Sequence, residues 1–222
     1  MMDETKLLGL DLSVASEQVI EVLLEDAPEP GLFREILISN TGRPEILRLL
    51  LESHSVPQEI KEEAGRILNL PVGVSSKPVR EEEFRRQSLL QKIQQLTVGE
   101  RIALALRGGH EIRSILSKDP NKEVVLSVLK NPKITETEVE MLAHSRNVPD
   151  EALRFISKNR DWMKNYNVVL ALVNNPKTPP GIGSPLVTGL RTRDIAALEK
   201  NKNVPDAVRS IAKKLLQVRK PH

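Results

Sequence analysis

The chain has 222 residues and a net charge of +3, with 39% hydrophobic and 28% charged residues, a globular composition that excludes an intrinsically disordered chain. It contains no cysteine, which excludes disulfides, thiolate metal sites and cysteine nucleophiles. Aromatic residues make up only 2%, so the core must be aliphatic, which suits helix packing better than a β-sandwich.

Apolar residues recur with helical spacing along most of the chain, and alternating strand-like patterns are essentially absent. The last segment shows this best, because Val208, Ala212 and Leu216 fall on one stripe. We therefore expect an all-α protein. The predicted helices span residues 16–25, 31–39, 44–54, 57–68, 83–95, 98–107, 110–117, 121–130, 135–145, 149–158, 162–174, 179–189, 192–200 and 205–217.

Two predicted helix starts carry the spacing of a capping box, in which a hydroxyl and a carboxyl satisfy amides of the first turn. They are Thr97 with Glu100 and Thr135 with Glu138. The helix at 179–189 contains Gly181, Gly183 and Pro185, so we expect it to be short or distorted.

The segment 70–80 is rich in proline, glycine and serine, and it coincides with a switch in charge. Residues 1–82 contain 8 Lys and Arg against 16 Asp and Glu, whereas residues 83–222 contain 25 against 14. We predict an acidic helical domain at 1–69, a linker at 70–82 and a basic repeat domain at 83–222. The two parts could dock on each other, or each could meet its own partner.

An internal repeat is the strongest pattern in the chain. The ten residues from Val124 to Lys133 return from Val168 to Lys177, with six of ten positions identical. Both copies end in Asn-Pro-Lys. A second pattern, Asn147 to Asp150, returns at Asn203 to Asp206, and we expect its proline to lie in the first turn of a helix.

These turns, set between helices rich in Leu, Val and Ala, resemble those of HEAT-like and armadillo-like helical repeat proteins, including the bacterial leucine-rich repeat variant type. The likeness covers about residues 110–217. It implies an α–α superhelix, a HEAT-like solenoid of stacked antiparallel helix pairs. For most members of these families it also implies protein binding, and for some nucleic-acid binding.

No set of residues forms a recognisable catalytic centre. His54, His110, His144 and His222 have no partner at a metal-binding spacing. Gly108-Gly109 lacks the pattern of a phosphate-binding loop and is better explained as a helix C-cap. We therefore expect a non-enzymatic protein without a cofactor or metal.

The segment 160–167 is the best candidate for a binding site. It contains the only tryptophan and the only tyrosine, and it coincides with an insertion in the second repeat copy. Such insertions fall in loops on one face of repeat arrays, and Trp, Tyr and Arg are common at binding hot spots. The alternative is that Trp162 simply fills space beneath a longer loop. The candidate partner-binding residues are Arg160, Trp162, Lys164, Tyr166, Arg191 and Arg193.

The functional prediction is a helical-repeat scaffold that mediates protein–protein interaction. The alternative is a nucleic-acid-binding protein that uses the basic C-terminal part, which its scarcity of aromatic platforms disfavours. Without cysteines or a long apolar run, we expect a cytoplasmic protein with no membrane partner.

Overall fold

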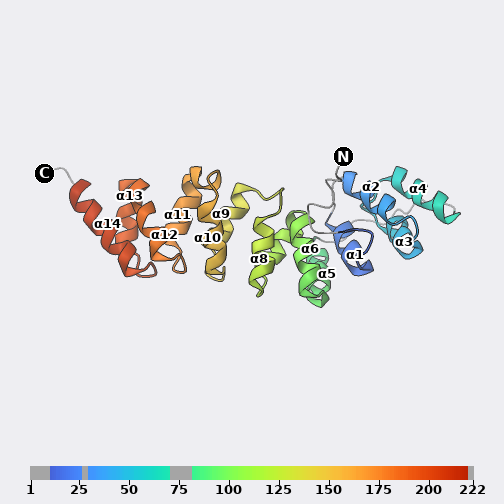
Figure 1. The fold of residues 1–222 in the computed structure, drawn as a ribbon, viewed down its shortest axis with the longest axis horizontal. Helices are drawn as coiled ribbons and strands as arrows, with labels where there is room; N and C mark the ends of the chain where they lie inside the picture. The colour runs from blue at the N-terminus through green and yellow to red at the C-terminus, as the bar shows by residue number, and fades with distance from the viewer. Residues whose placement is uncertain (1–10, 27–29, 71–81, 220–222) are drawn as a thin grey trace. The chain divides into compact units, whose positions relative to one another are not determined.

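A computed structural model describes residues 11–26, 30–70 and 82–219, with side chains from Leu89 onward in the last range. The described residues are all-helical, and strands are absent from them (Figure 1). The α-helices are α1 (Glu17–Glu25), α2 (Pro30–Ser39), α3 (Pro44–Glu52), α4 (Gln58–Leu68), α5 (Glu82–Gln95), α6 (Val98–Arg107), α7 (His110–Leu116), α8 (Lys122–Leu129), α9 (Glu136–His144), α10 (Asp150–Lys158), α11 (Tyr166–Asn174), α12 (Pro180–Leu186), α13 (Thr192–Lys200) and α14 (Asp206–Arg219). Two short 3-10 helices are η2 (Trp162–Lys164) and η3 (Val187–Gly189).

Backbone contacts divide the chain into two compact units, Met1–Leu116 and Ser117–His222, here called unit 1 and unit 2. Within unit 1, α1 contacts α3, α5 and α6. The contacts thus group α5 to α7 with the first four helices, whereas the switch in charge predicts a boundary at 70–82. Most of that predicted linker lies outside the described residues, so its character stays a prediction.

Charged side chains connect α1 and α2 to the helices that follow. Lys92 of α5 binds Glu21 at 2.8 Å and also Glu25, both on α1. Arg107 of α6 places Nη2 3.0 Å from each carboxylate oxygen of Glu35 on α2. Such bidentate pairs add geometric specificity to charge attraction. Carboxylates of α1 and α2 therefore pair with cations of α5 and α6 inside unit 1. Contact between the acidic and basic parts was one of the two outcomes considered for the charge asymmetry.

The start of α7 is capped by a carboxylate from the end of α1. Asp26 accepts a hydrogen bond from the backbone N–H of Glu111 at 3.1 Å. Burial raises the pKa of Asp26, although this N–H pulls the pKa down. A Cβ on Gly109 would run into the Asp26 carboxylate, so a larger residue here would have to displace that side chain. Gly108 is the C-cap of α6, as predicted.

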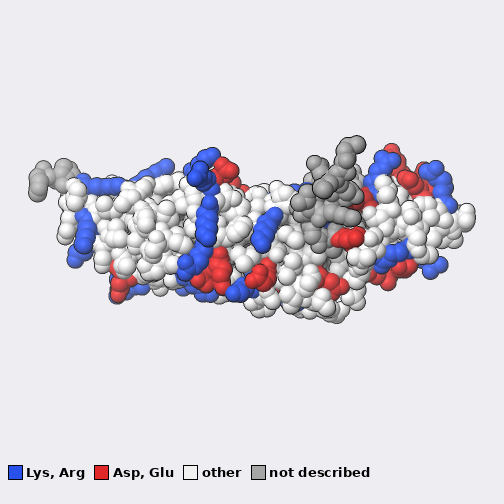
Figure 2. Space-filling view, viewed as in Figure 1, with Lys and Arg blue, Asp and Glu red and all other residues white. Residues whose placement is uncertain are grey.

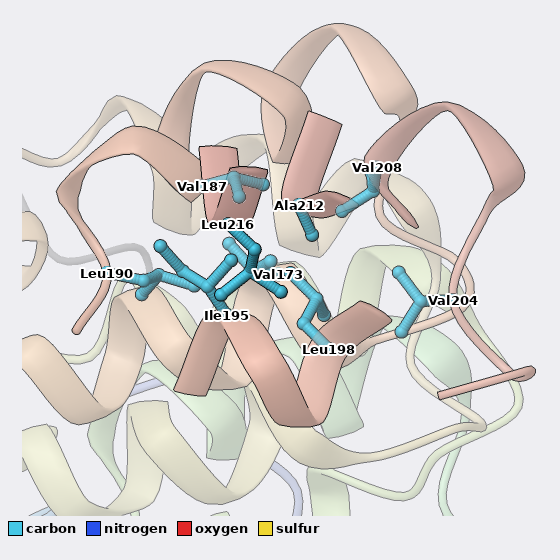
Figure 3. Close-up of a cluster of buried hydrophobic side chains, with 9 residues drawn as sticks. All are labelled: Val173, Val187, Leu190, Ile195, Leu198, Val204, Val208, Ala212 and Leu216. Atoms are coloured by element: carbon cyan, nitrogen blue, oxygen red, sulfur yellow. The ribbon is translucent and has the colours of Figure 1, made fainter. Parts of the chain in front are cut away.

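In unit 2, contacts link helices two positions apart as well as neighbours in sequence. α8 contacts α10, α9 contacts α11, and α12 contacts α14, while α13 packs on α14. A buried aliphatic cluster fills the space between α11, α13 and α14 (Figure 3). Its members are Val173, Val187, Leu190, Ile195, Leu198, Val204, Val208, Ala212 and Leu216. Tyr166 packs against the margin of this cluster, which fixes the position of its ring.

Both copies of the Asn-Pro-Lys repeat form the same turn. Asn131 and Asn175 are buried, and each side-chain oxygen accepts the backbone N–H two residues later at 2.9 Å. Asn175 also donates to the carbonyls of Ala143 and Ser145 at 2.6 and 2.9 Å, which ties the end of α11 to the end of α9. Because a buried polar group needs partners, these bonds explain why asparagine recurs at the turn.

Most predicted helices agree with the structure to within two residues, and both capping boxes are present. One helix prediction is wrong. The segment 162–174 is interrupted at Asn165, whose side chain caps α11 by accepting from the N–H of Asn167 at 2.9 Å. Pro149 lies one position ahead of the first turn of α10, at its N-cap. α12 is short and contains Pro185, as expected.

Candidate functional site

The turn between α10 and α11 is held by one asparagine and two aromatic rings. Asn159 accepts hydrogen bonds from the backbone N–H groups of Asp161 and Trp162, at 3.0 and 3.3 Å. The half-buried ring of Trp162 packs against Phe155 of α10, with 6.1 Å between ring centroids and an interplanar angle of 54°. This contact joins the turn to α10 and leaves part of the Trp162 ring exposed.

Tyr166 links the start of α11 to the start of α13. Its hydroxyl donates to the carboxylate of Asp194 and accepts the backbone N–H of Arg191 at 3.0 Å. The guanidinium carbon of Arg191 lies 4.5 Å from the centroid of the Tyr166 ring, a cation–π contact. The structure thus brings together two candidate residues that the sequence places 25 positions apart.

The phenol of Tyr166 links two groups because it donates one hydrogen bond and accepts another. Burial raises the pKa of Tyr166, and the hydrogen bond to Asp194 raises it further. A raised pKa keeps the phenol protonated near neutral pH, the opposite of what an activated nucleophile needs. The Tyr166–Asp194 pair therefore positions Arg191.

The other candidate cations are exposed. Lys164 forms an ion pair with Asp161 at 2.7 Å, which raises the pKa of the lysine and lowers that of the carboxyl. Both side chains are more than three-quarters exposed, so this pair adds little to stability. Arg160 and Arg193 are exposed and form no hydrogen bond or ion pair with any residue that the structure describes.

Polar contacts link the starts of α9, α11 and α13 and the end of α14 at one end of the helices of unit 2. Asn165 donates to Glu136 at the start of α9 at 2.6 Å. Tyr166 then leads to α13 through Arg191, as described above. Arg219, at the end of α14, donates to the carbonyls of Leu190 and Thr188 at 2.8 and 2.7 Å, beside the start of α13.

We call the cations at this end of the helices the basic edge. Its members are Arg160, Lys164, Arg191, Arg193 and Arg219. In Figure 2, blue atoms gather along the upper margin over α11, α13 and the end of α14, with some red among them.

At the opposite ends of the same helices, three cations form ion pairs with carboxylates. At the start of α10, Asp150 pairs with Arg154 at 3.2 Å, and Glu151 pairs with Lys122 at 2.7 Å. The Lys122 hydrogen bond lowers the pKa of Glu151 to about 2. At the start of α14, Asp206 pairs with Arg209. Lys122, Arg154 and Arg209 are thus paired with carboxylates, whereas Arg191 and Arg219 of the basic edge are held by a ring and by neutral carbonyls.

The sequence indicated six candidate residues but missed three groups that organise them. These groups are Asp194, Glu136 and Arg219, and each bonds a residue that lies 28 to 31 positions away in the sequence. That spacing corresponds to two helices and their turns. Polar residues about one helix pair apart in sequence would have been the signal, because the ion-paired Lys122 and Glu151 are also separated by 29 positions.

Comparisons with protein-family models, with curated proteins and with solved structures find no match for this chain. No helix among the described residues is long and apolar enough to cross a membrane. The described residues also contain no group of three His, Cys, Asp or Glu that could hold a metal ion.

Proposed function

We propose that the chain is a non-enzymatic helical-repeat scaffold whose unit 2 binds a partner protein through the basic edge. The contacts between helices two positions apart, and the identical Asn-Pro-Lys turns, support a solenoid of stacked helix pairs. The HEAT-like or armadillo-like resemblance and a cytoplasmic location are part of this proposal.

The observation that carries the proposal is the preorganised cation at the start of α13. Arg191 is exposed, yet its guanidinium is fixed over Tyr166, and the phenol of Tyr166 is fixed by Asp194. A cation that is already ordered loses less side-chain entropy when it binds. This arrangement has the character of an interaction hot spot, in which Arg and Tyr are enriched.

Two features favour a protein over a nucleic acid as the partner. Carboxylates of Asp161, Asp194 and Glu136 interrupt the row of cations, which suits a polypeptide with spaced charges better than the unbroken row of phosphates of a duplex. The rings that would stack on bases are also engaged, since Trp162 packs on Phe155 and Arg191 lies over Tyr166.

A quantitative pull-down from native lysate tests the proposal, with two matched double variants and with or without nuclease. The edge variant carries Arg160→Ala and Arg193→Ala, and the control variant carries Lys200→Ala and Lys202→Ala. All four side chains are exposed and form no bond with a described residue, so both variants should fold. Each variant removes two positive charges.

We expect the wild type and the control variant to retain the same nuclease-resistant partner proteins, and the edge variant to lose them. Equal retention by all three proteins would refute a role for the basic edge. Loss of all partners after nuclease treatment would favour nucleic-acid binding instead.

A further inference from the structure

We infer that the basic edge recognises an acidic polypeptide segment of its partner, an inference that rests on the proposed protein-binding function. The ligand groups would be Asp and Glu carboxylates, which guanidinium groups bind with two parallel hydrogen bonds. Unit 2 has the charge to attract such a segment, since residues 117–222 contain 19 Lys and Arg against 11 Asp and Glu.

The placement of two arginines is not explained by helix stability. Arg191 is the N-cap of α13 and Arg193 lies in its first turn, where the helix dipole disfavours positive charge. The helices α9, α10 and α14 of the same unit instead begin with an acidic residue. The only acid in the first turn of α13 is Asp194, and it accepts the Tyr166 hydroxyl. The two cations are thus left to face solvent without a carboxylate partner of their own among the described residues.

The cations of the basic edge also differ in how readily a ligand carboxylate can reach them. Arg160 and Arg193 are exposed and unpaired with any described residue. Lys164 is held only by Asp161, in a pair so exposed that a ligand carboxylate can replace Asp161 at little cost. Arg219 is fixed by two neutral carbonyls and keeps its full positive charge. Carboxylates spaced along an acidic segment would find several partners on one line.

Binding of a fluorescein-labelled oligoglutamate peptide to the full chain, followed by fluorescence anisotropy, tests this inference. We expect the edge variant Arg160→Ala/Arg193→Ala to bind the peptide about tenfold more weakly than the wild type. The control variant Lys200→Ala/Lys202→Ala should stay within about twofold, because it removes the same charge from the other end of α13. Circular dichroism of both variants establishes that each has the helix content of the wild type.

Three outcomes would overturn the inference. No binding of the peptide by the wild type at about 0.05 M salt would show that the edge does not attract carboxylates. An equal loss in both double variants would show that only overall charge matters. A labelled DNA duplex that binds more tightly than the peptide, and loses binding in the edge variant, would assign the edge to nucleic acid.

Because the pull-down uses the same variants, a failure of this inference can be distinguished from a failure of the proposed function. If the edge variant loses partner proteins but binds oligoglutamate as well as the wild type, the scaffold function stands and the acidic ligand is wrong. If the peptide distinguishes the variants but protein capture does not, the edge is a carboxylate site and the proposed function fails.

Discussion

The hydroxyl of Tyr166 connects two helices of unit 2, because it bonds both the backbone of Arg191 and the carboxylate of Asp194. The ring has a separate role, since it supports the Arg191 guanidinium and packs against the aliphatic cluster. A substitution that removes only the oxygen distinguishes the two roles.

We expect Tyr166→Phe to lower the free energy of unfolding of unit 2 by about 1 kcal/mol, because two polar groups lose their partner. Urea unfolding followed by the fluorescence of Trp162, the only tryptophan, measures this. Lys200→Ala is the control, with an expected change below about 0.5 kcal/mol. An unchanged midpoint for Tyr166→Phe would mean that the hydroxyl does not hold α13.

Two glycines of unit 1 should respond to alanine with opposite signs. Gly109→Ala places a methyl group against the Asp26 carboxylate, so we expect a loss of about 1–3 kcal/mol in stability. Gly99 lies in α6 with open space around it, so Gly99→Ala should be neutral or stabilising by about 0.5 kcal/mol. Thermal unfolding by circular dichroism measures both. A Gly109→Ala protein as stable as the wild type would contradict the close approach of the Asp26 carboxylate to Gly109.

At the scale of elements, Glu100 joins the capping box of α6 to the first residue before α1. The hydroxyl of Ser16 donates to Glu100 at 2.6 Å, and the backbone N–H of Thr97 donates at 2.9 Å. The Ser16 hydrogen bond, followed by those from Thr97, lowers the pKa of Glu100 from its ordinary value of 4.5. The ionised carboxylate is therefore favoured in the folded state.

Because the pKa is lowered on folding, this stabilisation is present above about pH 4.5 and is lost as the pH falls through the folded value. We expect wild type to be more stable than Glu100→Gln near pH 6, and the difference to shrink towards pH 3. Urea unfolding at a series of pH values measures it. A difference that does not vary with pH would show that ionisation of Glu100 does not matter.

The helices themselves were predictable because their signals are local. Apolar spacing, capping boxes and prolines placed most helices to within two residues. The break at Asn165 was missed because an asparagine can lie in a helix or cap one, and the choice depends on its contact with Glu136. Tyr166 and Arg191, both candidate residues, lie in contact, whereas Asp194 carries no local sequence signal for its hydrogen bond to Tyr166.

At the scale of the molecule, the pairing of α1 and α2 with α5 and α6 could not be read from the sequence. The ion pairs Lys92–Glu21 and Arg107–Glu35 span 71 and 72 positions. In the sequence, the same acidic and basic residues would be equally consistent with helix faces exposed to solvent. The switch in charge therefore indicated a boundary, whereas the contacts join the two sides of it.

We expect residues 117–222 to fold when expressed alone, because unit 2 is compact and contains its own buried cluster. Circular dichroism should show a helical spectrum, and Trp162 fluorescence should report one cooperative unfolding transition. A fragment with little helix would mean that unit 2 depends on the preceding residues.

The measurement that tests the binding function most directly is photo-crosslinking of the full chain in its native lysate. A benzoylphenylalanine replaces Thr192 in one protein and Lys202 in another, at opposite ends of α13, where both positions are exposed. The account predicts discrete protein adducts from position 192 that resist nuclease, and few from position 202. Equal adducts from the two positions, or adducts that contain nucleic acid, would contradict it.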